Sequence, residues 1–369
     1  MEVKLNRSDI KNKLDAVCQV TGSKMKFILS SVKIIKVADK LELHASNGTI
    51  SIITSIKLTD NDNSEGGMVV NAKELASLVD SAPEKEIKLI ERANTIDFVS
   101  GDFVAKLSKL PLTDYPEFKL NPPEDSVAIG FSVFREAITK VLAVVDENSS
   151  SLPLCGVYFK GMYVIASDGK MSTFATLPVG PILEVIVPVK LLNIVKGFER
   201  AEENILISVQ GPSITFKYGD TLLAGQVVDA KYPDIVKAIS AFKVDLSLKV
   251  DKTALLDVLD RATLFTSLSV NKAVPAIKFE IIPGKDKSTY RITSVVDGRQ
   301  TVESHPCVSW TGDKFESTFN VLYLKRAVSF VQGEVVSIRL GMPSAEGRRM
   351  PIFVDEDDKG YHSVIMAMK

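Results

Sequence analysis

Ala45-Ser46-Asn47-Gly48 recurs as Ala166-Ser167-Asp168-Gly169, and a weaker copy stands at Val295-Val296-Asp297-Gly298. Asn-Gly and Asp-Gly pairs between apolar segments favour the positive φ angles of a tight hairpin turn. Three copies spread along one chain indicate a long internal repeat. The sequence therefore predicts one structural unit copied three times, and its function is to be sought in the assembly of the copies.

The segments around each turn repeat as well. A helix start follows each turn, at Asn71, Pro188 and Asn320. Two copies then close with related segments, Asp114-Tyr115-Pro116-Glu117-Phe118 and Lys231-Tyr232-Pro233-Asp234-Ile235, at the same distance from Asn71 and from Pro188. The repeat is therefore a property of whole domains and not of one turn.

The repeat divides the 369 residues into three domains, which we place at residues 1–120, 126–240 and 245–369. Domains of this size are large enough to bury a core of their own. Two polar segments, residues 119–126 and 239–245, have the composition of linkers between domains.

Each copy reads as a short strand, a helix, several strands, a second helix and more strands. Asn6 or Ser8, Ser132 and Asp251 are the predicted N-caps of the opening helices, because apolar residues recur at helical spacing after them. Short meanders interrupted by two helices indicate α+β domains, each with two helices packed on antiparallel sheets.

The overall composition narrows the class of protein. Lys plus Arg total 45 and Asp plus Glu total 46, which argues against a generally basic nucleic-acid coat protein. The three cysteines are far apart and odd in number, which fits a reducing cytosol. We see no apolar signal core and no apolar run of the roughly 18 residues that a membrane span needs. We expect a cytoplasmic protein without membrane contact.

Signals of catalysis are poor. His44, His305 and His362 lack metal-ligand spacing with cysteine or carboxylate residues. The acidic stretch at 355–360 departs from the calcium-loop pattern, and no Gly-rich phosphate loop is present. We therefore expect no catalytic residue, no metal and no cofactor.

Three copies of a two-helix, multi-strand unit resemble the bacterial DNA polymerase sliding clamp, the β subunit of DNA polymerase III, over the whole chain. Ile165-Ala166-Ser167-Asp168-Gly169-Lys170-Met171 resembles the family segment Ala-Thr-Asp-Gly-His-Arg-Leu, and Lys231-Tyr232-Pro233-Asp234 resembles Phe-Pro-Asp-Tyr. Val364-Ile365-Met366-Ala367-Met368-Lys369 resembles the ending Val-Met-Pro-Met-Arg-Leu. Lys170-Met171 replaces His-Arg, Ala367 replaces a proline and the final leucine is missing. The chain is therefore identified as a divergent member.

The resemblance implies a head-to-tail homodimer in which six similar domains close a ring around DNA. Such a clamp is a non-enzymatic processivity factor. The implied partners are double-stranded DNA of any sequence, the DNA polymerase III alpha subunit, the clamp loader and other proteins with clamp-binding motifs.

The resemblance also implies the residues of three surfaces. The partner-peptide pocket would gather Leu154, Ser167, Gly169, Lys170, Met171, Pro233, Lys237, Ala238, Met350, Val364, Met366, Ala367 and Met368. The residues facing DNA would include Ser23, Lys24, Lys26, Lys73, Arg135, Lys140, Asn148, Lys190, Lys196, Arg200 and Lys325. The dimer interface would set Leu264 and Phe265 against the first-domain helix at 73–80, which begins with Lys73.

Simpler explanations stay open for these residues. Most helical lysines are solvated, and Leu154 and Pro233 also suit an ordinary core. Two other functions stay open as well: an enzyme of repeated domains with a site between copies, and a peptide-binding scaffold that does not encircle DNA. Retention on nicked circular DNA and loss after linearisation would separate a clamp from both.

Overall fold

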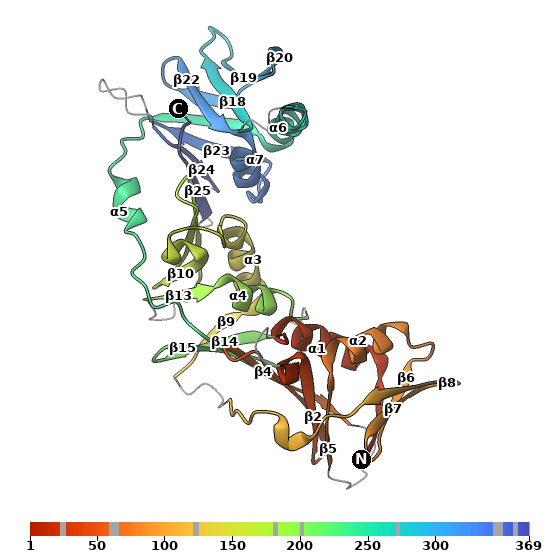
Figure 1. Ribbon diagram of the computed structural model, residues 1–369. Helices are drawn as coiled ribbons and strands as arrows, with labels where there is room; N and C mark the ends of the chain where they lie inside the picture. The colour runs from red at the N-terminus through yellow and green to blue at the C-terminus, as the bar shows by residue number, and fades with distance from the viewer. Residues whose placement is uncertain are drawn as a thin grey trace. The chain divides into compact units, whose positions relative to one another are not determined.

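The same order of strands and helices occurs three times along the chain. The computed structural model describes residues 1–22, 27–58, 66–120, 125–179, 184–199, 203–270, 274–341, 350–356 and 361–368 (Figure 1). Each copy is a strand, a helix, a group of strands of which the first three are consecutive hairpin partners, a second helix and a three-stranded meander. The group between the helices has four strands in the first two copies and five in the third, where β21 pairs with β17. This order confirms the predicted α+β class with antiparallel sheets.

The elements of the three copies are as follows. The first copy contains β1 (Glu2–Asn6), α1 (Arg7–Val20), η1 (Phe27–Ser30), β2 (Ser31–Val37), β3 (Lys40–Ser46), β4 (Ile50–Lys57), β5 (Gly66–Asn71), α2 (Ala72–Ser81), β6 (Glu86–Glu91), β7 (Thr95–Ser100), β8 (Phe103–Ser108) and η2 (Leu112–Asp114). The second contains β9 (Val127–Gly130), α3 (Phe131–Leu142), η3 (Leu152–Cys155), β10 (Gly156–Lys160), β11 (Tyr163–Ser167), β12 (Met171–Thr176), β13 (Glu184–Pro188), α4 (Val189–Lys196), β14 (Asn204–Gln210), β15 (Ser213–Tyr218), β16 (Thr221–Gln226) and α5 (Ile235–Ser240). The third contains β17 (Leu246–Asp251), α6 (Lys252–Ser267), β18 (Ala276–Ile282), β19 (Thr289–Val296), β20 (Arg299–Pro306), β21 (Ser309–Thr311), β22 (Phe315–Asn320), α7 (Val321–Ser329), β23 (Val335–Leu340), β24 (Ile352–Asp355) and β25 (Tyr361–Ile365).

The helix caps follow the sequence with one exception. Asn6, Asn71, Asp251 and Asn320 are N-caps whose side chains accept backbone N–H groups of the first helical turn. Ser132 is not a cap, because α3 already begins at Phe131. The ring of Phe131 is buried with its centroid 4.3 Å from that of Tyr218, and its N–H donates to the Glu203 carbonyl. Tertiary packing therefore starts this helix two residues earlier than a cap at Ser132 would.

The predicted linker at 239–245 is also partly helical, because Ile239 and Ser240 belong to α5. Asp234 caps this helix by accepting the N–H of Lys237 at 3.1 Å.

The described chain groups into two compact units, Met1–Glu136 with Pro178–Asp229 and Ala137–Leu177 with Ala230–Lys369. The second copy of the repeat is divided between the two units, because its residues belong partly to one and partly to the other. The division into three domains drawn from the sequence stays a prediction.

In the first unit one sheet runs β1-β6-β7-β8, and a second runs β5-β2-β3-β4-β16-β15-β14-β9. Helix α1 contacts β1 of the first sheet, β3 and β4 of the second, and α2 beside it (Figure 1). The buried face of α1 consists of Ile10, Leu14, Val17 and Val20. This helix therefore carries the apolar core between the two sheets.

In the second unit the order β10-β11-β12-β25-β24-β23-β17-β21 forms one sheet, and β20-β19-β18-β22 forms another. Helix α6 packs on β17, β19 and β20 and lies against α7. Within the described ranges, no helix combines the length and apolar character that crossing a membrane requires.

A buried ion pair ties α3 to the third copy inside the second unit. The Lys140 ammonium lies 3.3 Å from Glu356 Oε2 and 4.8 Å from the centre of the Tyr361 ring. The other Glu356 oxygen accepts the N–H of Gln332 at 3.0 Å. Lys140 is only 6% exposed, so this geometry argues against its predicted contact with DNA.

We expect Glu356→Gln to lower the free energy of unfolding by about 3 kcal/mol, because it removes the buried carboxylate that the buried Lys140 ammonium contacts. Lys140→Met combined with Glu356→Gln should be less damaging than Glu356→Gln alone, because the buried charge is then gone. Urea unfolding followed by fluorescence measures both. Equal stability of Glu356→Gln and wild type would contradict a structural role for the pair.

Candidate functional site

The second copy of the repeated turn presents Lys170 in a fixed backbone position. Asp168 Oδ1 accepts the N–H groups of Lys170 at 2.8 Å and Met171 at 2.7 Å, and Ser167 Oγ accepts that of Gly169 at 3.1 Å. Gly169 has a φ of +84°, a conformation that side chains with a Cβ rarely adopt. Asn47 and Ser46 make the equivalent bonds in the first copy. The repeated sequence therefore builds a repeated turn.

A cleft of about 300 Å³ opens beside this turn in the second unit. Its walls come from the repeated turn, from the segment around α5 and from the end of β25. The lining residues are Leu154, Ser167, Gly169, Lys170, Ser172, Pro233, Ile235, Ala238, Ile239, Phe242, Val364 and Met366.

The Tyr-Pro-Asp segment holds one wall of the cleft in place. The buried Tyr232 ring stacks on that of Tyr158, with centroids 4.5 Å apart and planes at 10°. Burial raises the pKa of the Tyr232 hydroxyl above its ordinary value. Pro233 then lines the cleft, and Asp234 caps α5. The three residues of the motif thus act differently, since the first anchors the segment, the second lines the cleft and the third starts the helix.

The end of β25 and the residue that follows it supply another part of the wall, next to the repeated turn. Strand β25 pairs with β12 in a register that sets Ile365 opposite Met171. Beyond the strand, the Met366 N–H donates to the Lys170 carbonyl at 2.9 Å, and the Met368 N–H donates to that of Thr318 at 2.8 Å. The Met366 side chain remains 38% exposed at the mouth of the cleft. A flexible, polarisable thioether there suits a surface that accepts more than one apolar side chain.

The cleft is apolar, and its hydroxyl groups are already engaged. Ser167 Oγ donates to the Met171 carbonyl at 2.9 Å, and Ser172 Oγ donates to Ser167 Oγ at 2.9 Å. Among the described residues that line the cleft, Lys170 is the one ionisable residue. An apolar surface with a few polar groups is the usual composition of a binding site.

The structure brings together most of the predicted pocket residues. Leu154, Ser167, Gly169, Lys170, Pro233, Ala238, Val364 and Met366 line the cleft. Met171 does not, because it points into the core and is 1% exposed. Lys237 is exposed on α5 and is not among the lining residues, and neither are Met350, Ala367 and Met368. Sequence reasoning missed Ser172, Ile235, Ile239 and Phe242, although the i, i+4 spacing of Ile235 and Ile239 on a capped helix was a usable signal.

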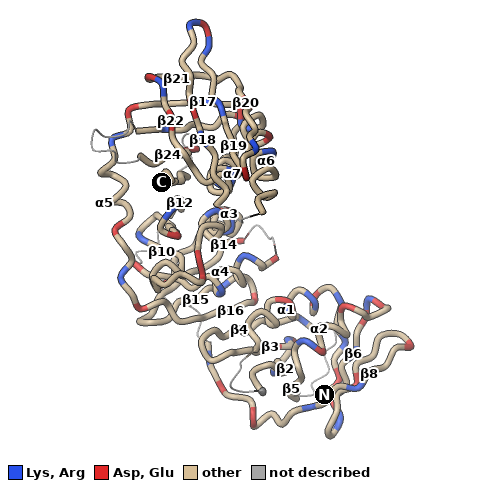
Figure 2. The backbone as a smooth tube through the Cα atoms, turned by 45° about the horizontal axis from the view of Figure 1, so that its top comes forward, with Lys and Arg blue, Asp and Glu red and all other residues tan. Residues whose placement is uncertain are grey.

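The residues predicted to face DNA differ in their surroundings. Lys73, Asn148 and Lys190 are exposed, while Arg135 and Lys196 are half-buried. The Lys325 ammonium lies 2.5 Å from Asp260 Oδ1. Ser23, Lys24, Lys26 and Arg200 lie outside the described residues. Acidic positions are interspersed with the basic ones along the backbone, as the balanced composition requires (Figure 2).

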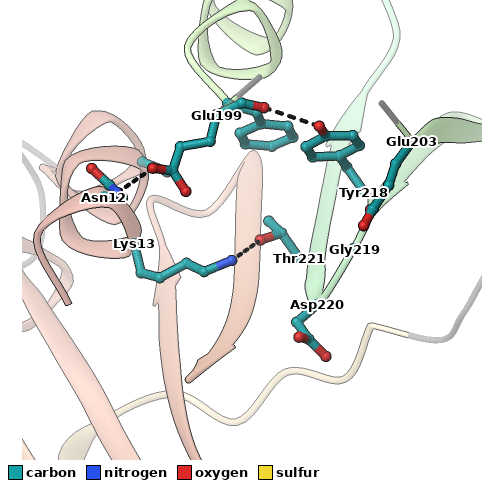
Figure 3. A pocket seen from close by; sticks show the side chains of 10 residues that line it. Asn12, Lys13, Glu199, Glu203, Tyr218, Gly219, Asp220 and Thr221 are labelled. Atoms are coloured by element: carbon teal, nitrogen blue, oxygen red, sulfur yellow. Dashed lines mark hydrogen bonds between the residues drawn. The ribbon is translucent and has the colours of Figure 1, made fainter. Parts of the chain in front are cut away.

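A second cavity, of about 210 Å³, lies in the first unit where α1 approaches the β15–β16 hairpin (Figure 3). Lys13 reaches Thr221 Oγ1 at 3.5 Å, and the Asn12 amide donates to the Glu199 carboxylate. The Tyr218 hydroxyl donates to the Glu199 carbonyl at 3.0 Å. These polar groups bond to one another across the cavity, so we interpret it as a seam between two copies of the repeat.

The predicted dimer residues occupy the end of α6. Leu264 is 66% exposed, and the half-buried Phe265 ring has the Arg299 guanidinium 6.0 Å from its centre. Arg299 opens β20, so this apolar surface lies beside the edge strand of its sheet. A large exposed aliphatic side chain at a helix end suits burial by a partner.

Residues 1–119 match the family described as "DNA polymerase III beta subunit, N-terminal domain". The beta sliding clamp of Lactococcus lactis is 24% identical over 91% of this chain and 91% of its own length. Among solved structures, the DNA polymerase sliding clamp of Bacillus subtilis has a TM-score of 0.88 at 18% identity, covering 100% of this chain and 99% of that chain. The Helicobacter pylori beta clamp bound to a DNA ligase peptide has a TM-score of 0.83 at 18% identity, with 100% of both chains covered. The fold is thus shared over the full chain.

Proposed function

The chain is a divergent member of the beta sliding clamp family, and from this premise we propose that it is a DNA sliding clamp that encircles duplex DNA and tethers the replicative polymerase. It acts without catalysis of its own and needs no cofactor. The observation that carries the proposal is the threefold order of elements together with two internal junctions of the same construction.

Both junctions join copies of the repeat by adding strand to strand. In the first unit β4 pairs with β16, from Thr54 opposite Thr221 to Ile50 opposite Gly225. In the second unit β12 pairs with β25, from Ala175 opposite Tyr361 to Met171 opposite Ile365. Each junction therefore joins the third strand of one meander to the last strand of the next copy, in the same antiparallel register.

Each junction pairs the third strand of one meander with the last strand of the next copy. Within the described sheets, one strand of each of these two types stands at a sheet edge without such a partner. Strand β20 corresponds to β4 and β12 but has only β19 beside it, and β8 corresponds to β16 and β25 but has only β7. Val104 on β8 is 57% exposed, and Val302 on β20 is 51% exposed. An open edge of this kind readily pairs with a strand of another chain.

A second copy supplies the missing strand to each edge. By the register of the two internal junctions, β8 of one subunit pairs antiparallel with β20 of the other, with Phe103 opposite Ser304 and Leu107 opposite Gln300. Helix α2 lies beside β8, and the Leu264–Phe265 surface lies beside β20, so both predicted interface regions flank this pairing. Unlike ends that meet in this way close a ring when the rotation fits.

The proposed ring and the cleft indicate two classes of partner, DNA and proteins that bind through short peptide segments. Exposed Lys73 and Lys190 attract phosphate without reading bases, which is what sliding along double-stranded DNA requires. The apolar cleft beside Lys170 binds short segments of the DNA polymerase III alpha subunit, the clamp loader and other clamp-binding proteins. The ligase peptide bound to the Helicobacter pylori clamp supports a peptide as the ligand. We place the protein in the cytoplasm, where the chromosome is replicated.

The cleft favours binding over catalysis. A repeated-domain enzyme would need several ionisable side chains converging on a substrate. In the part of the chain that the structure describes, Lys170 is the one ionisable residue that lines this cleft. The remaining alternative is a peptide-binding scaffold that does not encircle DNA, and topology separates it from a clamp.

We expect the clamp, loaded by its own clamp loader and ATP on nicked circular DNA, to survive a high-salt wash and to be lost when that DNA is cut once. Salt screens phosphate contacts but leaves topological linkage intact. Gel filtration of the protein–DNA mixture before and after cutting measures retention. Equal retention on circular and linear DNA would rule out encirclement and favour a scaffold.

Leu264→Asp with Phe265→Asp should convert the dimer to monomers at micromolar concentration, because two charges are then forced into a desolvated apolar contact. Sedimentation velocity measures the change. Leu152→Asp is the matched control, since Leu152 is similarly exposed at 59% but belongs to η3 and to neither edge strand.

Disulfide crosslinking between introduced cysteines tests the strand register of the proposed interface. In a background with Cys18, Cys155 and Cys307 replaced by serine, Val104→Cys should crosslink to Glu303→Cys of the second copy under mild oxidation, and Val104→Cys paired with Arg291→Cys should not. Crosslinking of both pairs, or of neither, would contradict the proposed register.

Deleting residues 366–369 should abolish binding of a clamp-binding peptide and leave the dimer intact. Strand β25 ends at Ile365, so the deletion removes one wall of the cleft without removing a strand. Calorimetric titration of the peptide, with a thermal melt and sedimentation as controls, tests this. Unchanged peptide affinity in a well-folded truncated protein means that the site lies elsewhere.

A further inference from the structure

The helix pairs of the first and third copies contain equivalent ion pairs. Lys11 on α1 contacts the carboxylate of Asp80 on α2, and the Lys325 ammonium on α7 lies 2.5 Å from Asp260 Oδ1 on α6. In both cases the lysine is the fifth residue of its helix and the aspartate is the ninth residue of the neighbouring helix. The two helix pairs therefore make the same crossing, with the roles of the two helices exchanged.

A second contact shows that the two helix pairs are built alike. Arg7, the first residue of α1, donates to the Ala82 carbonyl just after α2, at 2.8 Å. Lys252, the first residue of α6, donates to the Val331 carbonyl shortly after α7. The lysine–aspartate pairs thus belong to an arrangement that the repeat has kept in two of its copies.

Folding alone does not explain the two carboxylates. All four side chains of the lysine–aspartate pairs are exposed, and ion pairs between exposed side chains contribute little to stability. Asp80 also lies in the last turn of α2, where the helix dipole disfavours a negative charge. An asparagine at that position would keep the helix at no cost from the dipole.

The carboxylates cancel charge on the helices whose lysines attract DNA in the proposed clamp. Helices α1 and α2 together carry as many acidic as basic residues. Helix α4, which contacts α1 in the same unit, carries Lys190 and Lys196 and no acidic residue. A lysine held by a carboxylate must leave it before it binds a phosphate, so each pair adds little to the attraction for DNA.

We propose that Asp80 and Asp260 limit the grip of the clamp on DNA by holding Lys11 and Lys325 in intramolecular ion pairs. The inference rests on the proposed sliding function and adds the residues that keep the phosphate contacts weak. A ring that topology holds on the duplex does not need tight phosphate contacts to stay there. Tighter contacts would instead slow its movement along the DNA.

The test measures binding of the full-length protein, without clamp loader, to a short fluorescein-labelled duplex over a range of salt concentrations. Asp80→Asn and Asp260→Asn should each bind roughly two- to fivefold more tightly at low salt, the range for an exposed ion pair. The slope of log affinity against log salt should steepen by roughly 0.9 for each lysine released to a phosphate. Fluorescence anisotropy measures both effects, and a thermal melt checks that the variants are folded.

A double-mutant cycle separates the ion pair from a general change in charge. Lys11→Gln alone should change the affinity for DNA little, because Asp80 already holds that lysine. In the Asp80→Asn background, Lys11→Gln should remove the gain in affinity, because the released lysine is the source of that gain.

Asp220→Asn is the matched control. Lys40 and Asp220 form a pair at 3.2 Å with side chains 46% and 58% exposed, close to the 42% and 54% of Lys11 and Asp80. This pair joins the start of β3 to the turn between β15 and β16, and not two helices. Its removal should leave both the affinity for DNA and the salt slope unchanged.

Three results would overturn the proposed role of the aspartates. The first is equal affinity of wild type and both aspartate variants, including no binding by any of them, and the second is an equal gain in Asp220→Asn. The third is a gain in Asp80→Asn that survives Lys11→Gln. None of these results bears on encirclement, which retention of the loaded wild-type protein on circular but not linear DNA decides separately.

Discussion

The structure depends on antiparallel strand pairing between successive copies of one repeat. At β4–β16 and at β12–β25 the backbone ladder of one copy continues into the next, so each sheet extends over two copies. A buried hydroxyl pair lies within each ladder, Thr54 Oγ1 to Thr221 Oγ1 at 2.7 Å and Thr173 Oγ1 to Ser363 Oγ at 2.7 Å. A satisfied pair of this kind contributes about 1 kcal/mol, but a mismatched register would leave two buried hydroxyls unpaired and cost more. The pairs therefore favour one register over its neighbours.

The sequence predicts those features of the fold that depend on a few neighbouring residues, such as helix caps and tight turns. The Asn71, Asp251 and Asn320 caps and the Asp297-Gly298 turn depend on a few adjacent residues, and the structure confirms them. The start of α3 depends on Phe131 meeting Tyr218, a residue far along the chain, and the sequence-based cap at Ser132 was wrong for that reason. Lys140 was predicted to face DNA because of its position on a helix. Its carboxylate partner Glu356 lies in another copy of the repeat, and no local pattern in the sequence reveals that pairing.

The cleft shows the same division between local and distant information. The sequence identified the segment Tyr232-Pro233-Asp234 as one motif. In the structure Tyr232 anchors the segment by stacking on Tyr158, Pro233 lines the cleft and Asp234 caps α5. Met171 was misplaced because strand alternation turns it into the core, opposite Ile365. Ile239 and Phe242 were missed because their segment had been interpreted as a linker, although a segment that holds a wall of a cleft must itself be ordered. Polar composition alone does not separate a linker from a short capped helix.

The proposed ring joins its copies through three kinds of junction, two within each chain and one between chains. The two internal junctions are backed by the covalent chain and by buried hydroxyl pairs. The third, which we propose between β8 and β20, would have a comparable ladder without a covalent connection, and the Leu264–Phe265 surface lies beside β20. Separating two strands that the chain also holds together leaves them at high effective concentration, so they pair again quickly. Strands on separate subunits lack this advantage once the contact is broken. A ring built in this way therefore opens at the junction between subunits, and the apolar contact beside β20 determines how readily it does so.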